Sequence, residues 1–252
     1  MIIFHRSDLW KEVLVCYNIC MSIRKVPLCD NEYFHIYSRG NSKQKIFLDD
    51  EDYKHFIKLL YVSNTFLNYK FRDDIINNNI DAFEFDRIEP IVSIGAWVLM
   101  PNHFHIYIKT AKKSDWWTKI ERNRISEFMR KLLTAYTSYF NEKYTRTGGL
   151  FEGKFKSIHV EQDIQAKYLF SYIHLNPVKL IQKDWKENGI NDISRTLDFL
   201  KNYKWSSYFD YKGIQRLENK ILDINNFPKY FLNINDFDKE IIIWLKYKDE
   251  II

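Results

Sequence analysis

Cysteine, glycine and proline are scarce in this chain of 252 residues, which contains three, seven and five of them respectively. Cys16, Cys20 and Cys29 form no C-x-x-C pair and are odd in number. The sequence therefore predicts neither a disulfide framework nor a zinc knuckle, and we expect a reducing, cytoplasmic location.

Long apolar runs are missing as well. No segment approaches the roughly 20 consecutive apolar residues that a membrane-spanning helix needs. The first twenty residues are interrupted by charged side chains, unlike the apolar region of a signal peptide; these are Arg6, Asp8, Lys11 and Glu12. We expect a protein without a membrane partner.

The chain is instead rich in apolar and aromatic residues, at 46% and 17%. This composition argues against a disordered or fibrous protein, and the length allows a substantial core. Lysine and arginine (38) exceed aspartate and glutamate (33), which gives a net charge of +5. That mild excess is compatible with a polyanionic partner such as nucleic acid but does not identify one.

Strand and helix patterns alternate along the chain. Alternating or continuous apolar stretches predict strands at 32–40, 91–100, 103–109 and within 145–161. Helical spacing of apolar residues predicts helices at 48–67, 126–144, 163–176 and within 227–252. Residues 70–89, rich in Asn and Asp, are expected to form an inserted loop. The pattern predicts an α+β fold with an antiparallel sheet and flanking helices.

Two histidines stand one residue apart in the apolar stretch LMPNHFHIYIK, Leu99 to Lys109. On a strand, His103 and His105 would project from one face, while Phe104 would point to the opposite, buried face. Two neutral imidazoles make half of a divalent-metal site. The alternative is that both are polar residues on a solvated face, because so short a motif recurs by accident.

A second pair lies in YLFSYIHLNP, where Tyr172 and Asn176 are four residues apart and share one helix face. An asparagine carbonyl oxygen suits a hard divalent cation, and a tyrosine beside a metal is well placed to act as a nucleophile. The alternative for Tyr172 is an ordinary core residue, one of seventeen tyrosines.

Four blocks in order, VLMPNHFHIYIK, GGLFEGKFKSIHVE, YIHLNPVK and YKWSSYFDY, resemble the single-tyrosine HUH transposases. This family includes insertion-sequence transposases and REP-associated tyrosine transposases. The resemblance covers 32–213 and implies a transposase domain there, with a ferredoxin-like HUH endonuclease fold. It leaves 1–31 as an N-terminal extension and 214–252 as a C-terminal helical extension.

The resemblance also implies roles for the residues that match the motifs. His103 and His105 would bind Mg²⁺ or Mn²⁺, Asn176 would supply the third ligand, and Tyr172 would be the nucleophile. The implied activity is cleavage and rejoining of single-stranded DNA through a covalent 5′-phosphotyrosine. The implied partner is single-stranded or hairpin DNA, and a homodimer is compatible with the sequence.

Further candidates lie beside these blocks. Lys154 and Lys156 alternate with Phe155 and would share one strand face, from which they could contact a DNA backbone. Arg146 and Lys179 lie near the motif blocks, and solvated surface positions are the alternative for all four cations. Tyr168 is an alternative nucleophile, because it too stands four residues from Tyr172. His35, His159 and His174 are expected to be structural.

Two other functions remain open at this point. One is a domesticated, non-catalytic protein that binds hairpin or repeat DNA, and the other is a metal-dependent hydrolase with a binuclear site. Retention of His103, His105, Tyr172 and Asn176 together favours an active transposase over a domesticated remnant.

Overall fold

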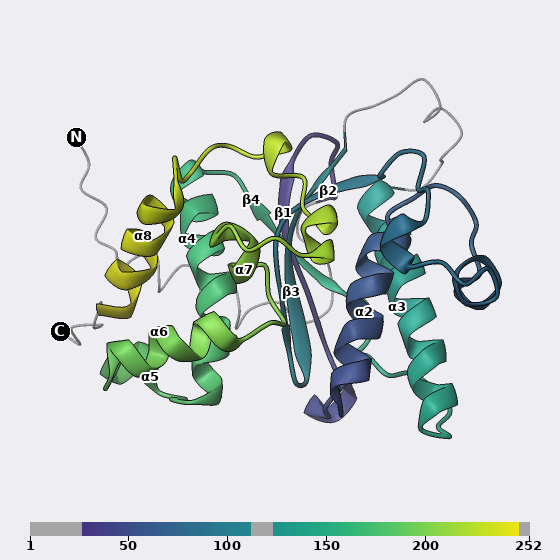
Figure 1. Cartoon of the computed structure of the whole chain (residues 1–252), viewed down its shortest axis with the longest axis horizontal. Coiled ribbons are helices and arrows are strands. Elements are labelled where there is room, and N and C mark those ends of the chain that lie inside the picture. The colour runs from purple at the N-terminus through teal and green to yellow at the C-terminus, as the bar shows by residue number, and fades with distance from the viewer. Residues whose placement is uncertain (1–26, 112–122, 247–252) are drawn as a thin grey trace.

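A four-stranded antiparallel sheet forms the centre of the computed structural model, which describes residues 27–111 and 123–246 (Figure 1). The sheet order is β2-β3-β1-β4, and the strands are β1 (Tyr33–Arg39), β2 (Val92–Met100), β3 (His103–Thr110) and β4 (Lys156–Val160). Helix α2 (Asp50–Val62) joins β1 to β2, and α3 (Arg124–Lys143) joins β3 to β4. This β-α-β-β-α-β order is that of a ferredoxin-like fold, so the predicted α+β class is confirmed.

The β2–β3 hairpin turns at Pro101 and Asn102, as the sequence predicted, and pairs Met100 with His103. Alternation along β3 places Phe104 on the face of the sheet that α2 covers. Its side chain is fully buried, and its ring centroid lies 5.1 Å from that of Phe56. The neighbouring His103 and His105 consequently project from the other face.

Helices α2 and α3 lie together on one face of the sheet (Figure 1). The start of α2 is fixed by a capping box, in which Asp49 and Asp52 each accept a hydrogen bond from the other's backbone N–H. From there Tyr53, Phe56 and Ile57 point into the core at helical spacing. Helix α3 begins two residues earlier than expected, because Asn123 caps it by accepting from Ser126 N.

The opposite face is covered by the second half of the chain, which begins with α4 (Asp163–Leu175). The later elements are η5 (Asn176–Leu180), α5 (Trp185–Asn188), α6 (Ile193–Asn202), α7 (Tyr208–Tyr211), η6 (Leu217–Ile221), η7 (Ile224–Asn226) and α8 (Ile234–Lys246). Helix α4 is buried along most of its length because α8 packs on its outer side, where Trp244 contacts Tyr168 and Glu240 pairs with Lys167.

The inserted segment 70–89 contains more structure than the predicted loop. A π-helical turn spans Arg72–Ile76, and a 3-10 turn spans Ala82–Glu84. The buried side chains of Ile75 and Phe83 anchor these turns to the core. The predicted inserted loop is therefore interrupted by two short helical turns, which the polar composition of the segment did not indicate.

The outer edge of β2 is covered by later parts of the same chain. Leu99 N donates to Trp205 O, Ser207 N donates to Trp97 O, and Asp223 N donates to Ile94 O, each at 2.9 Å. These are the positions at which a further strand would pair with β2. We call residues 205–207 together with Asp223 the edge cover.

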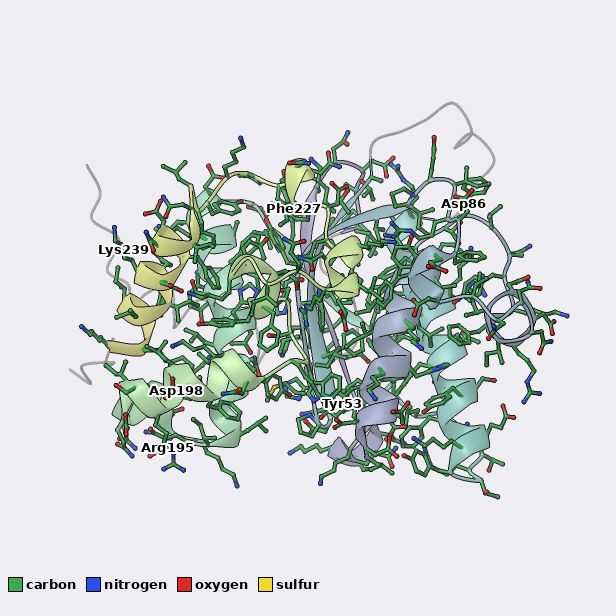
Figure 2. The ribbon with its side chains drawn as sticks, viewed as in Figure 1. Tyr53, Asp86, Arg195, Asp198, Phe227 and Lys239 are labelled. Carbon is green, nitrogen blue, oxygen red and sulfur yellow. The ribbon has the colours of Figure 1, made fainter. Side chains whose placement is uncertain are left out.

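Phe227, labelled in Figure 2, holds the C-terminal segment against the sheet. Its ring packs against Tyr107 and lies so close to Gly95 that a Cβ there would approach it to 2.8 Å. Over its described part, 214–246, the predicted C-terminal extension packs on the rest of the protein: η7 contacts β2, η6 contacts α2, and α8 contacts α4. Residues 1–26, most of the predicted N-terminal extension, lie outside the described residues. In the described ranges, no helix has both the length and the apolar character needed to cross a bilayer.

Candidate active site

His103 and His105 line a pocket of about 300 Å³ on the α4 side of the sheet. The other lining residues are Tyr37, Ser38, Arg39, Asn102, Glu152, Lys154, Lys156, Tyr172 and Lys179. The pocket thus brings together residues from β1, β3, the β4 region, α4 and η5. Sequence analysis singled out six of them, the two histidines, Tyr172 and three lysines.

Each histidine is oriented through its Nδ1 atom. His103 Nδ1 lies 2.7 Å from Asn102 Oδ1, and because that oxygen can only accept, Nδ1 carries the hydrogen and Nε2 keeps its lone pair. His105 Nδ1 lies 2.9 Å from Nε2 of His35, a buried residue of β1. The two site rings meet edge to face with centroids 5.0 Å apart.

Both imidazoles are neutral at physiological pH. Burial, with smaller contributions from Lys179 and Arg39 and against the opposing effect of the Asn176 side chain, lowers the pKa of His103 from 6.5 to about 4. Burial, together with the other histidines, holds the pKa of His105 well below its usual value. A neutral imidazole is the form that binds a metal ion.

Tyr172 reaches the histidines from α4. Its ring stands edge-on to that of His105, with centroids 5.5 Å apart, and the side chain is 7% exposed. On its other side, Lys186 Nζ from α5 lies 4.4 Å from the Tyr172 ring centroid. Lys186 carries no motif signal in the sequence, and it comes close because the chain reverses after Pro177.

Asn176 lies at the end of α4, one turn beyond Tyr172. Its side chain is 1% exposed, and neither Oδ1 nor Nδ2 makes a well-formed hydrogen bond with the described residues, although the amide lies close enough to His103 to raise the pKa of that ring. Leaving a buried polar group unsatisfied costs about 1–3 kcal/mol, so this amide points to a missing partner.

The donor set suits a divalent cation, because an amide oxygen and two neutral imidazoles are acceptable ligands for Mg²⁺ or Mn²⁺. Across 27–111 and 123–246, no three His, Cys, Asp or Glu side chains converge as a metal site. The donors that do converge are His103, His105 and the Asn176 amide.

Other candidates from the sequence lie elsewhere. Tyr168 packs against Trp244 and does not line the pocket, although its ring centroid is 6.0 Å from that of Tyr172. Arg146 lies at the end of α3, over Phe140, and is outside the pocket lining.

The region around β4 differs from the expected strand. Lys156 is the first residue of β4, whereas Lys154 precedes the strand, so the two do not share a strand face as predicted. Both line the pocket nevertheless. Just before them, Glu152 is held to β1 by its pairing with Arg39 at 2.7 Å and by the hydrogen bond from Glu152 N to Arg39 O.

The remaining histidines have identifiable contacts. His174 is buried and its Nε2 lies 2.8 Å from Ser207 Oγ, in agreement with the structural role expected for it. His159 contacts Glu32 and Glu161. Sequence analysis missed the contact of His35 with His105, because it depends on the pairing of β1 with β3.

No protein-family model matches this chain, and no curated protein matches it. Among solved structures, the chain is similar to a REP-associated tyrosine transposase bound to a REP hairpin. The TM-score is 0.43 and the identity 14%, over 79% of this chain and 90% of that one.

The chain is also similar to a bacterial tRNA(His) guanylyltransferase (Thg1)-like protein in complex with ATP. That match has a TM-score of 0.37 and 12% identity, over 77% of this chain and 74% of the other. All of these scores and identities are too low to establish a family for this chain.

Proposed function

We propose that this protein cleaves and rejoins single-stranded DNA by transesterification, as a single-tyrosine HUH transposase does. The observation that carries the proposal is the convergence of His103, His105 and Tyr172 on one pocket, with the buried amide of Asn176 next to His103. The histidines lie on a strand of the β2–β3 hairpin, and Tyr172 and Asn176 lie about seventy positions later along the chain. A tyrosine beside two neutral imidazoles and an unsatisfied amide is suited to phosphoryl transfer.

In the proposed reaction, Tyr172 Oη attacks a DNA phosphorus atom in line. The new Oη–P bond forms as the bond from phosphorus to O3′ breaks, the tyrosine loses its proton to solvent, and O3′ gains one. The products are a 5′-phosphotyrosine and a free 3′-hydroxyl. Attack by the 3′-hydroxyl of a second strand reverses the step, so strands are exchanged without ATP.

The chain supplies several groups for this chemistry. A divalent cation held by His103, His105 and Asn176 would neutralise phosphate charge and orient the scissile bond. The Lys186 ammonium over the Tyr172 ring favours negative charge on the attacking tyrosine.

Three lysines at the pocket wall, Lys154, Lys156 and Lys179, would contact the phosphates on either side of the cleavage point.

A covalent-adduct assay tests the proposal. Wild-type protein, Tyr172→Phe and Tyr168→Phe are incubated with single-stranded oligonucleotides from the DNA flanking the gene, with Mn²⁺ or with EDTA, and separated on denaturing gels. We expect a metal-dependent protein–DNA species that Tyr172→Phe abolishes and Tyr168→Phe retains.

Other results of the assay have distinct meanings. An adduct lost in Tyr168→Phe but kept in Tyr172→Phe would move the nucleophile to Tyr168. Tight binding of hairpin DNA without any adduct would support the non-catalytic DNA-binding alternative instead.

A further inference from the structure

His35 has no part in the proposed chemistry, yet it contacts the site directly. It lies on β1, is 3% exposed, and its Nε2 is 2.9 Å from His105 Nδ1. In the sheet, Tyr37 pairs with His105 and His35 pairs with Tyr107, so His35 and His105 are diagonal neighbours on one face. Their rings lie at 28° to each other with centroids 5.0 Å apart.

A hydrogen bond between two neutral imidazoles contains one hydrogen, which belongs to one ring or to the other. If His35 Nε2 carried it, His105 would accept at Nδ1 and would have its own hydrogen on Nε2. If His105 Nδ1 carries it, the lone pair of His105 is on Nε2. The second arrangement gives His105 the same tautomer that Asn102 imposes on His103.

We infer that His35 is a positioning residue, which accepts the hydrogen of His105 Nδ1 and so holds the His105 ring with its Nε2 lone pair available for a metal ion. This inference rests on the proposed function, since it concerns the same metal site. Ligand histidines in metalloproteins generally donate their second ring nitrogen to an orienting group, and loss of that group typically costs 10- to 100-fold in metal affinity.

The choice of histidine as the orienting group has a chemical consequence. A carboxylate in the place of His35 would add negative charge next to the site and reduce the attraction of a bound cation for phosphate. A neutral imidazole fixes the ring without that charge. The proposed ligands His103, His105 and Asn176, with His35 behind His105, would then offer a cation only uncharged groups and leave its charge available for a DNA phosphate.

Nitrogen-15 NMR of the histidine side chains, combined with Mn²⁺ titration, tests this role. In metal-free wild-type protein we expect His105 to carry its hydrogen on Nδ1. In His35→Leu, which removes the acceptor, we expect His105 to lose this preference and Mn²⁺ affinity to fall roughly 10- to 100-fold. His35→Gln places an amide oxygen near the former Nε2 position and should restore both properties in large part.

Two controls separate orientation from folding. His159→Gln changes a histidine on the other face of the sheet and should leave the His105 tautomer and Mn²⁺ affinity unchanged. Urea unfolding of each variant checks stability. Should His35→Leu not fold, the tautomer in the wild-type protein and the behaviour of His35→Gln still decide the question.

The outcomes against the inference are specific. A hydrogen on His105 Nε2 in the wild-type protein would overturn it, as would unchanged Mn²⁺ affinity in a folded His35→Leu. Absence of Mn²⁺ binding by the wild-type protein would instead overturn the metal site of the proposed function, and the positioning role with it.

Discussion

The ammonium group of Lys186 lies 4.4 Å from the centroid of the Tyr172 ring, so a cation from α5 covers the side chain that we propose as the nucleophile. The ring of His105 stands edge-on to the same tyrosine. Tyr172 is therefore held between a metal-ligand candidate and a positive charge that comes from a different part of the chain.

Replacing Lys186 with methionine should slow adduct formation roughly 5- to 30-fold, because the ammonium group stabilises the negative charge that Tyr172 gains in the transition state by about 1–2 kcal/mol more than it stabilises the neutral ring. The measurement is the rate of adduct formation under single-turnover conditions. Lys183→Met is the matched control, since this neighbouring lysine is exposed, whereas Lys186 is half-buried over the Tyr172 ring. Equal rates for both variants would contradict the role of Lys186.

Replacing Asn176 with leucine should stabilise the metal-free protein by about 1 kcal/mol while abolishing most Mn²⁺ binding. The reason is that Asn176 is buried without a well-formed hydrogen bond, and an apolar side chain of similar size removes that cost. Urea unfolding with EDTA and with Mn²⁺ measures both effects.

Asn64→Leu is the contrasting control for that experiment. Asn64 is equally buried, but it donates to Val92 O and accepts from Ile91 N and Val92 N. Its replacement should destabilise the protein by about 2–4 kcal/mol. A similar destabilisation in Asn176→Leu would argue that the Asn176 amide has a structural partner.

Replacing Lys154 and Lys156 with glutamine should weaken binding of single-stranded DNA at all sequences and flatten its salt dependence. Each lost phosphate contact lowers the slope of log K against log salt by about 0.7. Fluorescence anisotropy at several salt concentrations gives the slope. Arg146→Gln should leave it unchanged, because Arg146 lies outside the pocket, and a fall there would move the DNA path toward α3.

His55 should make the protein sensitive to acid at a position remote from the site. It stacks on Tyr139 with ring centroids 3.8 Å apart, and burial, with help from Lys58 and Lys143, lowers its pKa from 6.5 to about 4. Between these values the unfolded chain binds a proton that the folded chain does not, so the free energy of unfolding falls as pH decreases from about 6.5 to about 4.

His55→Gln should remove about 1–2 kcal/mol of that loss, measured by urea unfolding across this pH range. His159→Gln should have the opposite effect on the pH dependence of stability. Burial lowers the pKa of His159, but Glu32 and Glu161 raise it by more, so the net shift is upward. His159 therefore stabilises the fold at low pH, and this stabilisation is lost as the pH rises. Parallel pH profiles for wild-type and His55→Gln would contradict the first expectation.

Local periodicity predicted much of the site. Strand alternation placed His103 and His105 on one face with Phe104 opposite, and helical spacing placed Asn176 one turn beyond Tyr172. These relations depend on residues two or four positions apart, whose geometry is set by the backbone of a single element.

Relations between elements were not accessible in the same way. His35 meets His105 because of the register between β1 and β3, and Lys186 meets Tyr172 because the chain reverses after η5. Neither register nor reversal leaves a periodic signal. The anchors Ile75 and Phe83 were missed for a related reason, since the apolar residues of this Asn- and Asp-rich segment follow neither helix nor strand spacing.

The edge cover limits how two copies of this protein can associate. Trp205, Ser207 and Asp223 already occupy backbone groups on the outer side of β2. A strand from a second molecule cannot pair with this edge of β2 unless the edge cover is first displaced. If the protein forms a dimer, the two copies must therefore associate through the β4 edge of the sheet or through their helices. By covering the β2 edge, the C-terminal half of the chain also protects the protein from aggregation through that strand.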